Sequence, residues 1–266
     1  MENNNNINNV TFVTAYFKTY ESDYDETKSF EKRLELFMKI VELNINICLF
    51  ISPEYKDAID LISNKHQNVI VIEVLSIDDL EFTKIGKKNP NALNPPARRS
   101  HIKDLPNYMF LMNSKIEFIK KTINANPFNN NYFCWFDFSL PYVFKNMESS
   151  LTILKKYSES EFISEPFIAI PGCWNKCSNV EVLKDSIYWR FCGGFFIGDK
   201  NSLLSFYHVS IGHFEEFLNS TKKLVWEVNY WAWLELMGYI SFMWYPGDHN
   251  DSIINIPKEI IKNKLI

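Results

Sequence analysis

The chain has 266 residues, of which 46% are hydrophobic and 16% aromatic, and its formal net charge is −4. That apolar content suffices for one large globular domain, and only 8 glycines and 11 prolines exclude a collagen-like or linker-like chain. Basic residues are dispersed, so nucleic acid is not a predicted partner.

The amino-terminal MENNNNINN lacks a signal-peptide pattern, and no apolar run reaches the roughly 18 residues of a membrane span. A cytoplasmic location without a transmembrane segment is expected, which leaves a peripheral membrane contact open.

Five cysteines form an odd, scattered set along the chain. Cys173 and Cys177 make one C-x3-C pair in CWNKC, but no second pair of ligands follows nearby. A structural zinc site is therefore not predicted from this spacing, and reduced thiols are expected.

The first 75 residues alternate between strand and helix patterns. Strands are predicted over 10–17, 44–52 and 68–75 from β-branched and aromatic runs, and helices over 26–43 and 53–63 from apolar residues at helical spacing. This βαβαβ order is typical of an α/β fold with an open, mainly parallel sheet.

Beyond residue 75 the pattern is less regular. Residues 76–106 include KKNPNALNPPARRS, whose prolines and asparagines predict a long irregular loop. Later strands are expected over 132–136, 166–172, 188–200 and 241–251, and helices over 107–123, 179–187, 201–220 and 225–240.

Polar residues follow three of the predicted strands, at the edge where open parallel sheets bind ligands. They lie in TAY, in DFS and in GDHND. Asp137 in DFS could cap the following turn, or it could bind a divalent metal ion or a ribose. His249, with Asp248 and Asp251 beside it, could be a surface residue or a further ligand that brackets the same ion.

Two other features could belong to a site. Gly193 and Gly194 interrupt an apolar run, which indicates either a β-bulge or the floor of a substrate site. Glu227 lies among aromatic residues including Trp226, and could be a general base, a hydrogen-bonding acid beside a sugar-stacking platform, or a helix-terminal residue that faces water.

The chain lacks the sequence motifs of several enzyme classes. The first strand is not followed by Gly-x-Gly-x-x-Gly, and the chain contains neither a Walker phosphate loop nor a G-x-S-x-G elbow. Dinucleotide oxidoreductase, P-loop ATPase and serine hydrolase activities are therefore not predicted.

Four segments together resemble the HtrL/YibB family, also called WlaTC/HtrL, which is encoded mainly near bacterial surface-polysaccharide genes. They are VTFVTAYF, NSKIEFIKKTINANPFNNNYFCWFDFSLPY, FCGGFFIG and YPGDHND. The family is similar to nucleotide-sugar glycosyltransferases of the GT-A type. The resemblance implies a GT-A-like fold: a mainly parallel central sheet flanked by helices. The residues themselves predict a disordered Asn-rich leader (1–9) and one continuous domain (10–266). The resemblance makes 10–140 the nucleotide-sugar-binding half of that domain and 141–266 the acceptor-side half.

The resemblance also implies roles for individual residues. Those near the donor nucleotide would be Thr14, Ala15, Tyr16, Lys115 and Asp137. Arg98 is expected there for a different reason: the long loop that contains it could close over the departing diphosphate and supply positive charge. The metal ion, Mn²⁺ or Mg²⁺, would be bound by Asp137, Ser139 and His249. The sugar or acceptor site would include Gly193, Gly194 and Trp226.

Ser139 departs from the GT-A pattern, because it stands where a second aspartate is usual. A hydroxyl is a weaker ligand than a carboxylate for a hard cation. Asp248 or Asp251 could compensate, or the metal could bind only together with the nucleotide.

The leading hypothesis is a glycosyltransferase that moves a sugar from a nucleotide-sugar donor, first of all a UDP-sugar, to a glycan or glycoconjugate acceptor in surface polysaccharide synthesis. In an inverting reaction Glu227 or Asp248 would deprotonate the acceptor hydroxyl, whereas a retaining reaction needs no strong base. One alternative is a non-catalytic glycan- or partner-binding module on a degenerate transferase fold. Another is a metal-dependent phosphohydrolase built on Asp137, His249 and Asp251.

Overall fold

A computed structural model describes residues 8–19 and 29–262 of the chain. At its centre is a seven-stranded sheet with the strand order β3-β2-β1-β4-β6-β5-β7. The strands are β1 (Val10–Tyr16), β2 (Asn46–Ile51), β3 (Val69–Val74), β4 (Tyr132–Phe136), β5 (Ile168–Gly172), β6 (Phe195–Asp199) and β7 (Met243–Pro246). All neighbouring pairs are parallel except those that β6 makes with β4 and β5. The predicted α/β class with a mainly parallel sheet is confirmed.

The reversed direction of β6 decides which residues meet. Chain that follows β1, β4, β5 and β7 emerges at the same edge of the sheet as chain that enters β6. We call this the carboxyl edge. It brings together the turn after β4, the glycine pair before β6 and the turn after β7.

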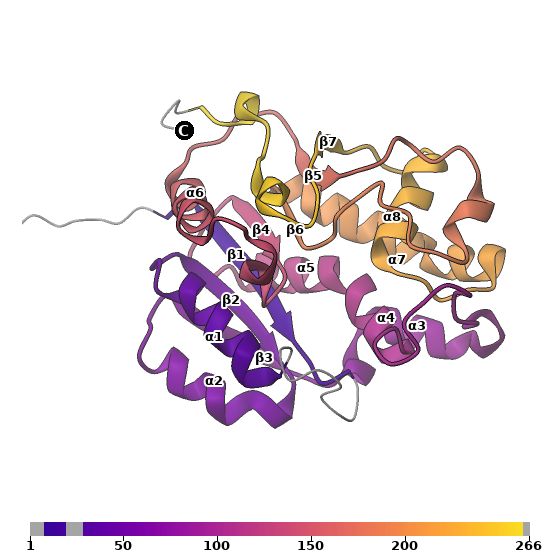
Figure 1. Cartoon of the computed structure of the whole chain (residues 1–266), viewed down its shortest axis with the longest axis horizontal. Helices are drawn as coiled ribbons and strands as arrows, with labels where there is room; N and C mark the ends of the chain where they lie inside the picture. The colour runs from indigo at the N-terminus through magenta and orange to yellow at the C-terminus, as the bar shows by residue number, and fades with distance from the viewer. Residues whose placement is uncertain (1–7, 20–28, 263–266) are drawn as a thin grey trace, which may run out of the picture.

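Helices cover both faces of the sheet (Figure 1). One face carries α1 (Phe30–Val41), α2 (Lys56–Ser63) and α6 (Met147–Glu159), and the other carries α3 (Glu81–Lys88), α4 (Pro106–Asn113), α5 (Lys115–Ala125), α7 (Lys200–Thr221) and α8 (Glu227–Leu236). Phe133 and Trp135 of β4 pack toward the α5 side, whereas Cys134 and Phe136 pack toward the α1 side. Because successive strand side chains point to opposite faces, β4 is buried on both.

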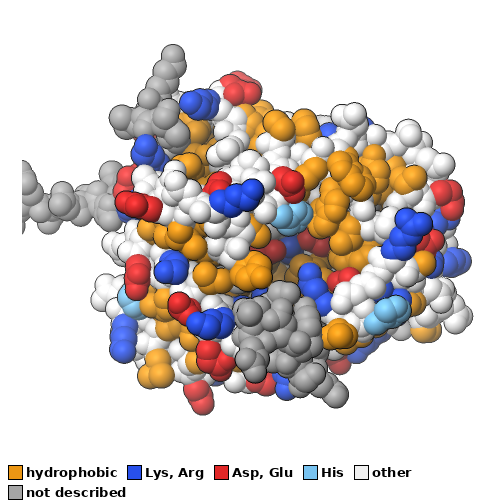
Figure 2. All heavy atoms as spheres, viewed as in Figure 1, with side chains coloured by type: hydrophobic (Ala, Val, Ile, Leu, Met, Phe, Trp, Pro, Cys, Tyr) orange, Lys and Arg blue, Asp and Glu red, His pale blue; other side chains and the backbone are white. Residues whose placement is uncertain are grey.

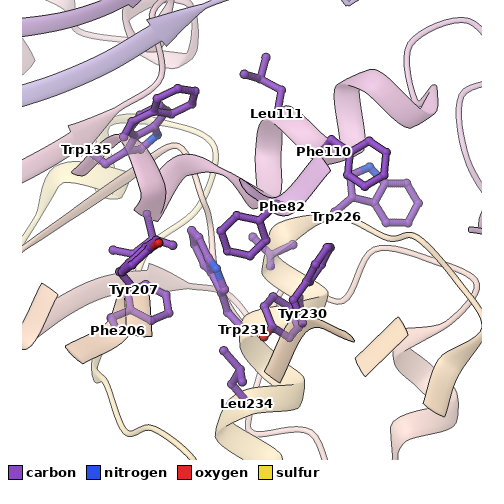
Figure 3. Packing of buried hydrophobic residues seen from close by; sticks show 14 of the residues in the cluster. Phe82, Phe110, Leu111, Trp135, Phe206, Tyr207, Trp226, Tyr230, Trp231 and Leu234 are labelled. Atoms are coloured by element: carbon purple, nitrogen blue, oxygen red, sulfur yellow. The ribbon is translucent and has the colours of Figure 1, made fainter. Parts of the chain in front are cut away.

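The core on the α5 side is rich in aromatic rings (Figure 3). Tyr230 and Trp231 of α8 are fully buried there, and the ring of Trp231 packs edge-on against Phe196 and Phe206 at 5.5 Å. The Tyr230 hydroxyl donates a hydrogen bond to the backbone oxygen of Ser210 at 2.5 Å. The helix α8 is buried from Glu227 to Leu234, and its buried polar side chains Glu227 and Asn229 are hydrogen-bonded within the protein.

The sequence prediction of an irregular loop over 76–106 is wrong in part, because α3 lies within it. A reciprocal capping box between Ser76 and Asp79 comes just before this helix. Gly86 lets α3 approach α4 closely, since a Cβ there would stand 2.3 Å from the ring of Phe110. The prolines that suggested a loop come only after the helix.

Two other predicted elements are shorter than expected. The helix over 107–123 is divided into α4 and α5 at Ser114, whose hydroxyl donates to the Phe110 oxygen at 2.9 Å. The strand over 188–200 is a strand only as β6. The carbonyl oxygens of Gly193 and Gly194, just before it, bond to groups outside the ladder.

Parts of two amino-terminal predictions lie outside the described residues: residues 1–7 of the leader and residues 26–28 of the first helix, the rest of which contains α1. Within the leader, Asn8 donates a side-chain hydrogen bond to the Asn44 oxygen at 3.0 Å, and the Asn9 amide donates to the Ser158 oxygen at 2.6 Å. Over residues 8–19 and 29–262, the helices do not combine the length and the apolar character needed to cross a membrane.

Candidate active site

Lys115, Asp137 and Glu227 form a cluster at the carboxyl edge. The Lys115 ammonium lies 2.9 Å from Asp137 Oδ1 and 2.8 Å from Glu227 Oε1, and it donates to the Gly193 oxygen at 2.9 Å. An ammonium has three hydrogens, so these acceptors satisfy it. The side chains of Lys115 and Glu227 are 1% and 6% exposed, whereas that of Asp137 is 41% exposed. Asp137 is therefore the member of the cluster that reaches the surface.

Each member is placed by the end of a secondary-structure element. Lys115 begins α5, directly after the break at Ser114, and Glu227 begins α8. Asp137 follows β4. Gly193 has no side chain to obstruct the cluster, since a Cβ there would stand 2.2 Å from Glu227 Oε1. The glycine thus allows the carboxylate to approach the backbone closely.

The two carboxylate oxygens of Asp137 have different surroundings. Oδ1 accepts a hydrogen bond from the indole Nε1 of Trp135 at 2.9 Å, in addition to its ion pair with Lys115. Asp137 is further fixed by its amide, which donates to the Gly194 oxygen at 2.9 Å. Among the described residues, Oδ2 has no hydrogen-bond partner. The protein therefore holds one oxygen and presents the other.

The cluster keeps its cation charged. Burial acts to lower the pKa of Lys115, but the carboxylates of Asp137 and Glu227 raise it by more, so the pKa lies above its ordinary value. Lys115 stays an ammonium and is fully used in holding the two acids in place.

A second cation comes from the segment between β3 and α4. Burial lowers the pKa of half-buried Lys103, and the charges of Asp104, Asp137 and Glu227 oppose that shift. Lys103 is thus within electrostatic reach of the cluster. Arg98, which the sequence placed near the nucleotide, is exposed and is anchored through its amide, 2.7 Å from the Asp185 oxygen.

The end of β1 contributes an aromatic group. Thr14 is fully buried, with no hydrogen-bond partner for its hydroxyl among the described residues, and Ala15 is half-buried. The half-buried ring of Tyr16 packs against three other rings, those of Phe30, Tyr55 and Phe138. Of the three residues predicted to line a nucleoside, Tyr16 is the one that offers a ring.

Ser139 is bound by a cation of the protein. Its hydroxyl accepts a hydrogen bond from Arg33 Nη1 at 3.0 Å, across the turn that follows β4. The sequence did not single out Arg33. A guanidinium bound to Ser139 places positive charge where a second aspartate would favour a metal.

His249 is held by other neighbours. Its ring packs edge-on against Trp189 with centroids 4.4 Å apart, and its Nδ1 lies 3.3 Å from Asp248 Oδ1. A backbone hydrogen bond from His249, ahead of other causes, lowers the pKa of Asp248. Asp251 accepts hydrogen bonds from Ser150 and from the amides of Lys145 and Asn146 just before α6, so it joins the turn after β7 to the start of that helix.

Asp137 could bind a divalent metal ion as a single carboxylate ligand, but not as part of a cluster of protein ligands. Among the described residues, one group could hold a metal with side chains alone: Cys173, Cys192 and Asp248, whose ligand atoms lie within 4.8 Å of one another. Asp137 does not belong to this group. Asp137 Oδ2 fits a hard divalent ion as a single carboxylate ligand, the pattern found when phosphate oxygens and waters complete the coordination.

The predicted substrate contact Trp226 lies in the core. It is the residue before α8 and is 4% exposed.

The surface is hollowed near the middle of the view in Figure 2, where acidic and basic side chains lie inside and hydrophobic ones lie around the rim.

Sequence comparison identifies relatives of the chain. A family described as "Bacterial protein of unknown function (HtrL_YibB)" matches residues 8–223. Protein HtrL of Escherichia coli (strain K12) is 26% identical over 142 residues, which cover 48% of this chain and 50% of that protein. The match therefore spans about half the length of that relative.

Two solved structures overlap loosely with the chain. Mouse xyloside xylosyltransferase 1, in its apo form, gives a TM-score of 0.44 at 7% identity, over 89% of this chain and 84% of that one. A 4-diphosphocytidyl-2C-methyl-D-erythritol synthase from Anaerococcus prevotii DSM 20548 gives 0.40 at 12% identity, over 93% and 91%. Overlaps this loose do not carry an activity over to this chain. The family match, which extends over most of the sequence, shows that the chain belongs to the HtrL_YibB family.

Proposed function

We propose that the protein transfers a sugar from a nucleotide-sugar donor, a UDP-sugar in the first instance, to a glycan or glycoconjugate acceptor. The observation that carries the proposal is the position of Asp137. It follows β4, the neighbour of β1 on the side opposite to β2 and β3. Open α/β sheets bind ligands beyond the carboxyl ends of their strands at such a switch of direction.

The charges around Asp137 suit a diphosphate leaving group. Sugar transfer requires that the negative charge of the departing diphosphate be stabilised. We assign that role in part to half-buried Lys103 of the segment before α4, because the charge of Asp137 opposes the lowering of its pKa by burial. A divalent ion bound to Asp137 Oδ2 together with the diphosphate would add Lewis-acid stabilisation. Lys115 contributes by positioning, since its three donors already hold Asp137, Glu227 and the Gly193 oxygen.

The remaining parts of the donor have matching surroundings. Tyr16, half-buried at the end of β1, belongs to an aromatic group with Phe30, Tyr55 and Phe138, and we assign the nucleobase to the edge of this group. Gly194 lies half-buried beside Asp137, where a Cβ would stand 3.5 Å from Asp137 Oδ2, whereas the room that Gly193 leaves is taken by Glu227. We assign the sugar to the surface over Gly194, next to Asp137 Oδ2.

The proposal is tested by ligand-induced thermal stabilisation. UDP-, GDP- and dTDP-sugars are added with and without Mn²⁺ to the wild type, to Asp137→Ala and to Asp57→Ala, an exposed carboxylate of α2. We expect a UDP-sugar to raise the Tm of the wild type and of Asp57→Ala but not of Asp137→Ala. If no nucleotide sugar stabilises the wild type, there is no donor site.

A second measurement separates a transferase from a binding module. Release of nucleoside diphosphate is followed with the stabilising donor and a panel of saccharide acceptors. Acceptor-dependent release in the wild type that is lost in Asp137→Ala supports transfer. Stabilisation without any release would instead favour a non-catalytic binding protein.

A further inference from the structure

Two thiols and a carboxylate meet at another part of the carboxyl edge. Cys173 follows β5, Cys192 lies just before the glycine pair that leads into β6, and Asp248 follows β7. Their ligand atoms all lie within 4.8 Å of one another, and the two sulfur atoms are 3.7 Å apart. Cys192 is buried, whereas Cys173 and Asp248 are exposed. The group is anchored on one side and open to water on the other.

Backbone hydrogen bonds hold the three segments in place. The bonds run from Cys173 N to Trp189 O at 2.9 Å, from Cys192 N to Pro171 O at 2.7 Å and from Gly247 N to Gly172 O at 3.0 Å. The Asp248 carboxylate is oriented by the His249 amide, which donates to Oδ1 at 2.7 Å. The ligand atoms are therefore positioned before any ion arrives.

The spacing of the sulfur atoms matches a tetrahedral metal site. Two thiolates bound to one zinc ion at about 2.3 Å lie about 3.8 Å from each other in tetrahedral geometry. The 3.7 Å found here is close to that separation. A disulfide needs about 2.0 Å, so the same sulfur atoms would have to move much closer together to form one.

We propose that Cys173, Cys192 and Asp248 bind a Zn²⁺ ion, with a water molecule as the fourth ligand. Two sulfur ligands and one carboxylate suit zinc, whereas Mg²⁺ and Ca²⁺ prefer oxygen alone. In the structure both thiols donate to the Gly247 oxygen, at 3.2 and 3.5 Å. Binding replaces these two thiol protons with the ion, so two protons leave for each Zn²⁺ bound.

The partner of Cys173 is not the cysteine next to it in sequence. Cys177 completes the C-x3-C pattern, but its sulfur is buried and donates to the Asn179 oxygen at 3.0 Å. The sheet instead brings Cys192 to Cys173. Cys177 is therefore a matched control that shares the sequence motif and lacks the geometry.

The site also connects to the Lys115 cluster through the chain. Cys192 is followed directly by Gly193, whose oxygen accepts from Lys115. An ion at Cys192 would fix the backbone one residue from that bond. The zinc site does not depend on the proposed function, because its ligands lie outside the Lys115 cluster.

The test is a Co²⁺ titration of the reduced, full-length protein, made metal-free beforehand. We expect one equivalent of Co²⁺ to produce the thiolate-to-cobalt charge-transfer band and the visible bands of tetrahedral cobalt, and Zn²⁺ to abolish both. Cys173→Ser and Cys192→Ser should lose the bands, and Cys177→Ser should keep them. Asp248→Ala should weaken binding by more than about tenfold.

Three outcomes would overturn the site. One is a wild type that shows no bands, and another is an unchanged spectrum in Cys173→Ser. The third is a reduced protein that binds no ion yet forms a Cys173–Cys192 disulfide on oxidation. If the serine variants do not fold, native mass spectrometry of the wild type and of Asp248→Ala decides. It should find one EDTA-removable Zn²⁺ per chain in the wild type and less in the variant.

Discussion

The two polar groups of the carboxyl edge differ in what balances their charge. In the Lys115 cluster, two carboxylates share one buried ammonium of the same chain. In the group around Cys173, two thiols and a carboxylate face mainly backbone groups. The first group is completed by the protein itself, so its removal should affect folding. The second gains its full set of interactions only with an added ion.

Removing the ammonium should have the largest effect. Lys115→Ala leaves the carboxylates of Asp137 and Glu227 without their cation, one of them buried. Breaking a buried ion pair by removing one partner costs about 3–5 kcal/mol of unfolding free energy. Denaturant unfolding measures that loss.

An exposed ion pair provides the control. Lys32 and Glu35 lie 3.0 Å apart, with side chains 62% and 60% exposed. Lys32→Ala should change stability by no more than about 0.5 kcal/mol, as exposed helix pairs do. A loss in Lys115→Ala no larger than this would contradict the neutralising role of Lys115.

Glu117 sharpens the comparison, because it is a buried carboxylate bonded to a backbone amide rather than to an ammonium. Oε2 accepts from the Glu81 amide at 2.9 Å, and burial, ahead of other causes, raises the pKa of Glu117 from 4.5 to about 7. Protons then bind the folded state more tightly than the unfolded one, so stability is lost as pH rises from about 4.5 to 7.

The test is the pH dependence of unfolding for the wild type and Glu117→Gln. Relative to the variant, the wild type should lose on the order of 3 kcal/mol between pH 4.5 and 8, at about 1.4 kcal/mol per pKa unit. Parallel pH profiles would show that Glu117 titrates in the folded state as it does in the unfolded chain.

Gly193→Ala should disturb the cluster by crowding. The added Cβ would stand 2.2 Å from Glu227 Oε1, and overpacking of this kind costs about 1–3 kcal/mol. Gly212→Ala in α7 is the matched control, because nothing lies within 4 Å of its Cβ. That variant should gain about 0.5–1 kcal/mol from the helix preference of alanine. Equal effects at both positions would contradict the close approach of Glu227.

Asp137→Asn should have the smallest effect on stability. The side chain is partly exposed, an amide oxygen can still accept from Trp135 and Lys115, and Lys115 keeps the carboxylate of Glu227, so we expect a change below about 1 kcal/mol. Stabilisation by a UDP-sugar should nevertheless disappear. Glu227→Gln, at a buried position, should cost more in unfolding free energy. The reverse order of stabilities would mean that Asp137 is the structural acid of the pair.

Local signals in the sequence were enough for the strands and for the position of Asp137. The apolar run before Asp137 has strand length, and β4 ends where that run ends. The long helix over 201–220 likewise corresponds to α7. The prolines of 76–106 all follow α3, so they do not prevent a helix over Glu81–Lys88.

The sequence spacing of the residues could not predict which side chains meet at the carboxyl edge. Lys115 and Glu227 are 112 residues apart, and only the sheet order brings them together. The C-x3-C spacing of Cys173 and Cys177 predicted no metal site, and it could not show that the fold places the sulfur of Cys192, 19 residues away, 3.7 Å from that of Cys173. Trp135 and Arg33 gave no signal, because an indole in a strand and a guanidinium on a helix are ordinary in such positions.

The direction and place of β6 have a consequence for the order of folding during synthesis. In the described sheet, β6 joins β4 to β5, so the two parts of the sheet pair only through Phe195–Asp199. A nascent chain that has emerged only as far as β5 can form β3-β2-β1-β4, with the edge of β4 unpaired. Exposed strand edges invite pairing with other chains. The interval between synthesis of β4 and of β6 is therefore when this protein is most open to aggregation, and a truncation before Phe195 would make that state permanent.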